Sequence, residues 1–373
     1  MQQAALDNNN MTRARTNANV TAAVGRNMII NGSMNVAQRS ASVTGLGAAG
    51  GYFTCDRWNI ASGNTAGRFT MSQTADGPNG ISANCIKLDC TTADSSIAAA
   101  ENLVLQQKFE GQNLQRIGKG IAGAKQITLS FYVKASAAFT FGVELRDRDN
   151  DRQITKLYDT TTDWVRHEFT FPADVDDGSS PFDDDNASSL ELRFWLHAGS
   201  SFAGGTLNTA AFANTTTANR AAGIDSFFSN TDNNWFITGV QMEIGPVATE
   251  FEQEEISVTQ NKCKRYYQQF DAADSASASA GIVGVGASTT VAVCTSTFVP
   301  EMRAAPTFAE NNAVLNHGGG VSAITSFSNF SSRRTFSADL TCSGGGLSAD
   351  GAVVVQFTGG QTAASQVTFD AEL

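Results

Sequence analysis

The sequence predicts a mostly β protein: a jelly-roll β-sandwich, then one amphipathic helix, then a smaller C-terminal β domain. Three observations support this fold class. The 373 residues include 34 Gly and 24 Phe but only 6 Pro, a mixture typical of many short strands joined by small-residue turns. Apolar residues alternate with polar ones over many short runs. One stretch alone shows the wider spacing of a surface helix.

The alternating runs define the sandwich, which we expect over residues 27–252. In residues 127–133, every second side chain from Ile127 to Val133 is apolar, which is the pattern of a strand with one buried face. The same alternation recurs near residues 139–145, 165–171, 190–196 and 236–244. Antiparallel strands with one buried face are typical of a sandwich or a jelly roll.

The remaining segments flank this sandwich. Residues 253–271 are predicted to form a connecting helix, because Ile256, Cys263 and Phe270 recur at helical spacing and acidic residues precede basic ones. Strand-like runs return in residues 272–373, the expected C-terminal β domain. Residues 1–26 are polar and without period, so we expect them to be ordered only by attachment to a partner.

The charge balance excludes some partners. The chain has 25 Lys and Arg against 36 Asp and Glu, for a net charge of -11. Nucleic-acid binding needs clustered basic residues to neutralise phosphates, so no nucleic-acid partner is expected. No stretch approaches the roughly 20 apolar residues of a membrane span, and the first residues lack an apolar signal-peptide core. We therefore expect no membrane insertion and folding in a cytosol.

Cysteine spacing and glycine motifs indicate neither a metal centre nor a cofactor. The six cysteines form no CxxC pair, and buried thiols are the expected state in a cytosol. Residues 118–123 match the glycine pattern of a dinucleotide-binding loop, but the strand follows the motif instead of preceding it. No cofactor is expected.

A candidate glycan-binding face follows from alternation near residue 195. If Leu192, Phe194 and Leu196 face the core, then Arg193, Trp195 and His197 face the other way. An outward indole offers a flat apolar surface on which a sugar ring can stack, and its two neighbours can donate hydrogen bonds. The alternative is that this face packs under a loop or against a neighbouring subunit. The same reasoning places Trp235, with Gln241 and Glu243, on an outward face.

An acidic loop is the weak metal candidate. Asp183, Asp184 and Asp185 form its densest part and offer carboxylate ligands for calcium, although a solvated acidic loop is the alternative. For catalysis, no G-x-S-x-G elbow is present and only three histidines occur. Hydrolysis of glycosides by two carboxylates stays open, because the separation of the carboxylates depends on the fold.

Several motifs resemble a family of tailed-bacteriophage and prophage virion proteins of the tail-fibre or appendage type. They begin with NMIINGSMNVAQRS (27–40) and YFTCDRW (52–58). They continue with ITLSFYVKAS (127–136), WVRHEFTFP (164–172), NWFITGVQMEIGPVATEFE (234–252) and CKRYYQQF (263–270). TFVPEMRAAPTF (297–308) and the terminal FDAEL are similar to the C-terminal module of the same family.

This resemblance implies a non-enzymatic structural protein of a virion, with a jelly roll like that of carbohydrate-binding modules. It implies attachment to other virion proteins through residues 1–26, a homotrimer assembled in the host cytoplasm, and contact with a host-surface glycan or receptor. The calcium that such jelly rolls often hold is not expected, because Ser33, Met34 and Asn35 occupy the first-strand positions. A purely architectural virion protein and an envelope-polysaccharide depolymerase are the alternatives.

Overall fold

The computed structural model describes residues 25–175, 180–271, 277–358 and 365–373. The chain divides into two compact units, Met1–Ile256 and Ser257–Leu373. Of the predicted attachment segment 1–26, all but Gly25 and Arg26 lie outside the described residues. The two units are considered separately below.

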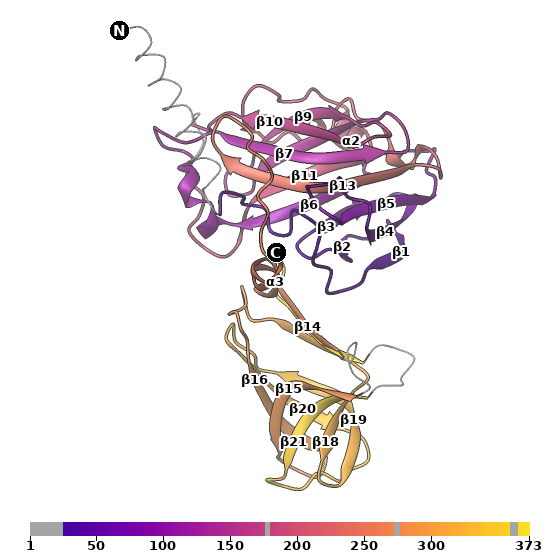
Figure 1. Ribbon diagram of the computed structural model, residues 1–373, viewed down its shortest axis with the longest axis vertical. Helices are drawn as coiled ribbons and strands as arrows, with labels where there is room; N and C mark the ends of the chain where they lie inside the picture. The colour runs from indigo at the N-terminus through magenta and orange to yellow at the C-terminus, as the bar shows by residue number, and fades with distance from the viewer. Residues whose placement is uncertain (1–24, 176–179, 272–276, 359–364) are drawn as a thin grey trace. The chain divides into compact units, whose positions relative to one another are not determined.

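The first unit is a sandwich of two antiparallel sheets (Figure 1). One sheet has the order β1 (Ser42–Leu46), β4 (Arg68–Thr74), β5 (Cys85–Thr92), β13 (Asn234–Ile244), β7 (Ile127–Ala135), β10 (Val165–Phe171). The other has the order β12 (Ala213–Asn214), β9 (Arg152–Asp159), β8 (Thr140–Asp147), β11 (Ser188–Ala198), β6 (Asn102–Glu110), β3 (Asn59–Gly63), β2 (Gly51–Tyr52). Short helices lie in the connections: η1 (Gly111–Asn113), η2 (Gln115–Ile117), α2 (Ser200–Ala203), η3 (Thr217–Asn219) and η4 (Phe227–Ser229).

Alternating apolar side chains from both sheets fill the space between them. Phe131 of β7 meets Phe194 of β11 edge to face, with ring centroids 5.0 Å apart, and both rings are fully buried. Such perpendicular pairs add to the free energy that burial of the two rings already supplies. The predicted sandwich is therefore confirmed.

The second unit contains a closed antiparallel barrel and a small sheet (Figure 1). Around the barrel the order is β15 (Ser277–Gly286), β16 (Val291–Thr297), β20 (Thr335–Cys342), β19 (Gly320–Asn329), β18 (Ala313–His317), β21 (Ala352–Thr358). The small sheet has the order β14 (Tyr267–Asp271), β22 (Gln366–Asp370), β17 (Thr307–Asn311). Phe308, Phe336 and Phe369 pack against one another in the core of the second unit. A closed barrel leaves no unpaired sheet edge.

The connecting helix is shorter than the 253–271 predicted from sequence. Helix α3 covers only Ile256–Lys264, and Tyr267–Asp271 forms strand β14 instead. Strand β14 pairs with β22, which places Phe270 opposite Val367. Pairing with a strand about 100 residues away overrides the helical spacing of Cys263 and Phe270, because tertiary contacts outweigh local propensity.

The structure also shows the state of the cysteines and the character of the helices. All six cysteines are buried thiols, as predicted. In the ranges that the structure describes, no helix has both the length and the apolar character needed to cross a membrane.

Candidate functional site

The predicted glycan face on β11 has the predicted orientation but is not exposed. Leu192, Phe194 and Leu196 lie in the core between the sheets, and Arg193, Trp195 and His197 lie on the opposite side of their sheet. The exposed fraction is 7% for Arg193 and 0% for both Trp195 and His197. The expectation of an outward, solvent-facing site on these three residues is therefore wrong.

The chain itself covers this face. Residues 199–230, here called the covering segment, connect β11 toward β13 and contain α2, β12, η3 and η4. Phe202 of this segment lies 5.3 Å from the Trp195 ring, centroid to centroid, and the Arg220 guanidinium lies 5.1 Å above the same ring. The indole thus packs against the chain's own residues in the place that the prediction reserved for a sugar.

An ion pair between Glu144 of β8 and Arg220 of the covering segment fixes this segment to the sheet. Its two carboxylate oxygens accept hydrogen bonds at 2.8 Å from Nε and Nη2 of Arg220. The indole N–H of Trp195 donates to Glu144 Oε2, also at 2.8 Å, and Arg193 Nε lies 3.3 Å from the same oxygen. Glu144 is fully buried. Bidentate, charge-assisted hydrogen bonds of this kind fix geometry as well as adding energy. The polar residues on this face therefore serve structure.

Trp235 lies on the opposite side of its sheet from the one predicted. It is fully buried in the core between the sheets and contacts Phe194, with ring centroids 6.1 Å apart. The register of β13 against β7 shifts between Thr238 and Gln241, and Gly239 there has a left-handed φ of 59°. Such a bulge inverts the facing of residues on its two sides, so Trp235 shares the core with Val240 although their parity differs.

The carboxylates of the acidic loop point to solvent and do not cluster in the described structure. Asp183, Asp184 and Asp185 are all exposed, and among the residues that the structure describes their carboxylates do not converge with other ligand groups. Asp185 instead accepts a hydrogen bond from the Ala187 N–H within its own turn, at 2.8 Å. The exposure of these carboxylates fits the alternative of a solvated acidic loop, and calcium binding there stays a prediction.

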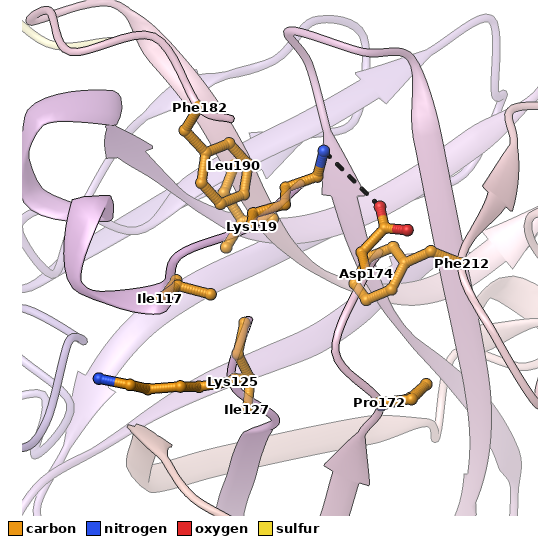
Figure 2. A pocket seen from close by; sticks show the side chains of 9 residues that line it. All are labelled: Ile117, Lys119, Lys125, Ile127, Pro172, Asp174, Phe182, Leu190 and Phe212. Carbon is orange, nitrogen blue, oxygen red and sulfur yellow. Dashed lines mark ion pairs between the residues drawn. The ribbon is translucent and has the colours of Figure 1, made fainter. Parts of the chain in front are cut away.

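A small pocket beside Lys119 is a structural crevice (Figure 2). The Lys119 ammonium lies 2.7 Å from Asp147 and 3.6 Å from Asp174, and Figure 2 shows it reaching toward Asp174. The walls are mostly apolar, including Phe182, and the cavity measures about 10 Å³. That volume is about the space one water molecule needs. A cavity of that volume is too small for an organic ligand, and the Lys119 ammonium is already paired with two carboxylates.

A larger pocket lies in the barrel of the second unit. It measures about 230 Å³ and is lined by His317, Gly318, Ser348, Gly351, Ala352 and Val353. His317 ends β18 and pairs with Val353 of β21, so neighbouring strands supply two of the walls. Pockets that enclose a drug-sized ligand measure roughly 300–1,000 Å³. This pocket is therefore of a size for a smaller molecule, such as one sugar ring.

Hydrogen bonds within the turn orient the His317 ring. The Gly319 N–H donates to Nδ1 at 3.2 Å, which leaves Nε2 to donate to Ser322 Oγ at 3.1 Å. Gly318 is exposed, and a Cβ added to it would meet no atom within 4 Å. The lining contains hydroxyl, imidazole and backbone groups but no Asp, Glu, Lys or Arg. Sequence patterns missed this pocket, because turns from two separate segments build it.

Neither a protein-family model nor a curated protein matches the sequence. Among solved structures, a CBM4 structure is 12% identical with a TM-score of 0.29, covering 57% of this chain and 97% of that one. TmCBM61 in complex with β-1,4-galactotriose is 10% identical with a TM-score of 0.29, covering 59% and 99%. A CBM22-1-CBM22-2 tandem domain from Paenibacillus barcinonensis Xyn10C is 11% identical with a TM-score of 0.26, covering 91% and 98%. At these identities and TM-scores, the likeness assigns no ligand to this chain.

Proposed function

We propose that this chain is a structural protein of a bacteriophage virion, a tail fibre or similar appendage, whose C-terminal barrel binds an uncharged sugar of the host surface. The ordered motifs between residues 27 and 270 support the virion assignment by resemblance. The sandwich and the barrel are compatible with it, since both are rigid β structures that present loops and turns to a partner.

The pocket at His317 is the observation that carries the binding proposal. Its volume suits one sugar ring, its lining offers hydrogen-bonding groups, and no ionised carboxylate, lysine or arginine lines it. An uncharged polar ligand fits such a lining, because it needs hydrogen bonds without charge compensation. The net charge of -11 also gives no long-range attraction toward an anionic envelope polysaccharide.

One small pocket binds one sugar weakly, so several copies are needed. A homotrimer, attached to the particle through residues 1–26, presents three pockets together, and linked sites raise the apparent affinity through effective concentration. The mass of the purified full chain in solution tests this part. A trimer is expected, and a monomer at micromolar concentration contradicts it.

A purely architectural role is the second candidate. The covering segment favours it, because Phe202 and Arg220 occupy the face of the sandwich that the sequence predicted for sugar. In this case the chain takes part in the particle, and no host glycan binds to either unit. An envelope-polysaccharide depolymerase is the third candidate, and release of reducing ends from a polysaccharide would identify it.

Substitution at Gly318 tests the binding proposal. Because a Cβ at Gly318 meets nothing within 4 Å, Gly318→Phe is expected to fold and to place a ring at the mouth of the pocket. Binding of the full chain is measured on a panel of bacterial envelope glycans, with reducing-end release recorded in parallel. We expect wild-type protein and the matched control Gly318→Ala to bind and Gly318→Phe to bind at least 10-fold more weakly.

The outcomes separate the three candidates. Absence of binding by the wild type to every glycan supports the architectural role and overturns the receptor role. Equal binding by Gly318→Phe and Gly318→Ala shows that sugar binds elsewhere than at His317. The virion assignment is tested separately, by antibody labelling of intact particles in the electron microscope; particles that carry no label contradict it.

A further inference from the structure

Three side chains of the kinds that bind metal ions lie close together inside the sandwich unit. Of the three, only His197 belongs to a site described above. Asp94 follows strand β5, Glu101 directly precedes β6, and His197 lies near the end of β11. One ligand atom from each of the three lies within 4.8 Å of the other two. The residues are 5%, 4% and 0% exposed, respectively. We propose that Asp94, Glu101 and His197 bind a divalent transition-metal ion.

The donor set decides the class of ion. Imidazole nitrogen with carboxylate oxygen suits Zn²⁺ and neighbouring transition metals, whereas Ca²⁺ and Mg²⁺ prefer oxygen alone. Ligand atoms around a tetrahedral Zn²⁺ lie about 3.4 Å apart, given bonds of about 2.1 Å. His197 Nε2 and Glu101 Oε2 are already 3.2 Å apart, so a small movement of the Asp94 carboxylate completes the set.

Charge provides the second argument. Within the described ranges, no Lys or Arg nitrogen is paired with the Asp94 or the Glu101 carboxylate, and the nearest basic group is His197, 3.2 Å from Glu101. Buried carboxylates are costly unless they are paired or coordinate a metal. A divalent cation between them supplies the missing positive charge.

The orientation of His197 is that of a metal ligand. Its Nδ1 lies 2.7 Å from Ser226 Oγ, the partner that a ligating imidazole usually requires for its second nitrogen. Donation from Nδ1–H to Ser226 leaves the Nε2 lone pair directed at Glu101.

Asp94 is held in place by its own hydrogen bonds. Its Oδ2 accepts from Thr65 Oγ1 at 2.9 Å and from the Ala66 N–H at 2.8 Å. The Ser96 N–H donates to Oδ1 at 3.2 Å. An ionised carboxylate has about four lone-pair positions, so one position on Oδ1 is left for a metal.

A bound ion has a structural consequence. It joins the connection between β5 and β6 to the end of β11, about 100 residues later in the chain. The backbone already makes this contact, since the Gly199 N–H donates to the Glu101 carbonyl at 2.8 Å. An ion that binds the folded state alone raises the free energy of unfolding of this unit.

Zinc binding to the tag-free full chain tests the proposal. The protein is stripped with EDTA, titrated with Zn²⁺ by calorimetry, and its zinc content is measured by mass spectrometry after gel filtration. We expect one zinc per chain and a higher thermal midpoint with zinc than with EDTA. Glu101→Gln retains size and polarity but removes a charge, and we expect at least 10-fold weaker binding. Glu243→Gln is the control, because Glu243 is a buried carboxylate of the same unit at 4% exposure.

The alternative to a metal site is a cluster held by hydrogen bonds alone, and two results would favour it. In the other tautomer, Nε2–H donates to Glu101 and Ser226 donates to Nδ1, and the three groups form a metal-free hydrogen-bonded cluster. Wild-type protein that retains no zinc and shows the same thermal midpoint in zinc and in EDTA overturns the proposal. Equal zinc affinity of Glu101→Gln and Glu243→Gln overturns it as well, since the ion then binds elsewhere.

Discussion

Trp195 distinguishes a structural role from a sugar-binding role for the outer face of β11. Trp195→Ala removes a fully buried indole that contacts Phe202 and Arg220 and donates to Glu144. Truncation of a buried aromatic residue to Ala costs about 3–5 kcal/mol of folding free energy. Trp195→Phe keeps a ring but loses the hydrogen bond to a carboxylate, for which we expect a cost of about 1.5–3 kcal/mol.

Intrinsic fluorescence measures this effect in the first unit alone. The chain has four tryptophans, and all of them (Trp58, Trp164, Trp195 and Trp235) fall within Met1–Ile256. Urea unfolding followed by tryptophan emission therefore reports the sandwich, and the Ala variant is expected to shift the midpoint by roughly 1–2 M.

Trp164→Phe serves as the matched control. The Trp164 indole is partly exposed and donates to the Asp76 carbonyl at 3.1 Å, so its replacement is expected to cost less than about 1 kcal/mol. A Trp195→Ala protein as stable as the wild type would refute the structural role. Loss of glycan binding together with unchanged stability would restore the binding role that the sequence predicted.

Three further predictions concern packing, thiols and pH. Gly67→Ala puts a Cβ 2.4 Å from the buried Phe228 ring, and we expect a loss of about 1–3 kcal/mol in the same urea assay; an unchanged midpoint contradicts this. Burial raises the pKa of Cys294 to about 12, so a disulfide reagent at pH 8 should label it only after unfolding, and rapid labelling of the native protein contradicts the buried position. Burial lowers the pKa of His167 from 6.5, against a hydrogen bond to Asp159. The unfolded chain therefore binds the proton more readily, and the sandwich loses stability as pH falls below about 6.5. This loss should be smaller in His167→Gln, and an equal pH dependence in both proteins would count against the assignment.

Strand alternation predicted the core but not what covers the outside of the sandwich. The sequence placed Leu192, Phe194 and Leu196 on the correct face, because a period of two is a local property of a strand. Whether Trp195 on the other face meets water depends on residues 199–230, which come back over the sheet with little regular structure. The alternation of residues within one strand does not predict that a later segment of the chain packs over that strand.

Two other errors have equally specific causes. A bulge at Gly239 shifts the register of β13, and one inserted residue moves Trp235 from the expected outer face to the core. The predicted helix ended early because β14 pairs with β22, a contact between segments distant in sequence. The pocket at His317 had no sequence signal, since it combines one hairpin turn with the start of a strand more than 30 residues later.

The most direct test of the central proposal, that sugar binds at the barrel and not at the sandwich face, is hydrogen exchange with and without a bound envelope glycan. The account predicts slower exchange in the glycan complex at residues 317–320 and 348–353, with unchanged exchange at residues 191–197 and in the covering segment. Slower exchange at residues 191–197 and 199–230, with none at His317, would contradict it.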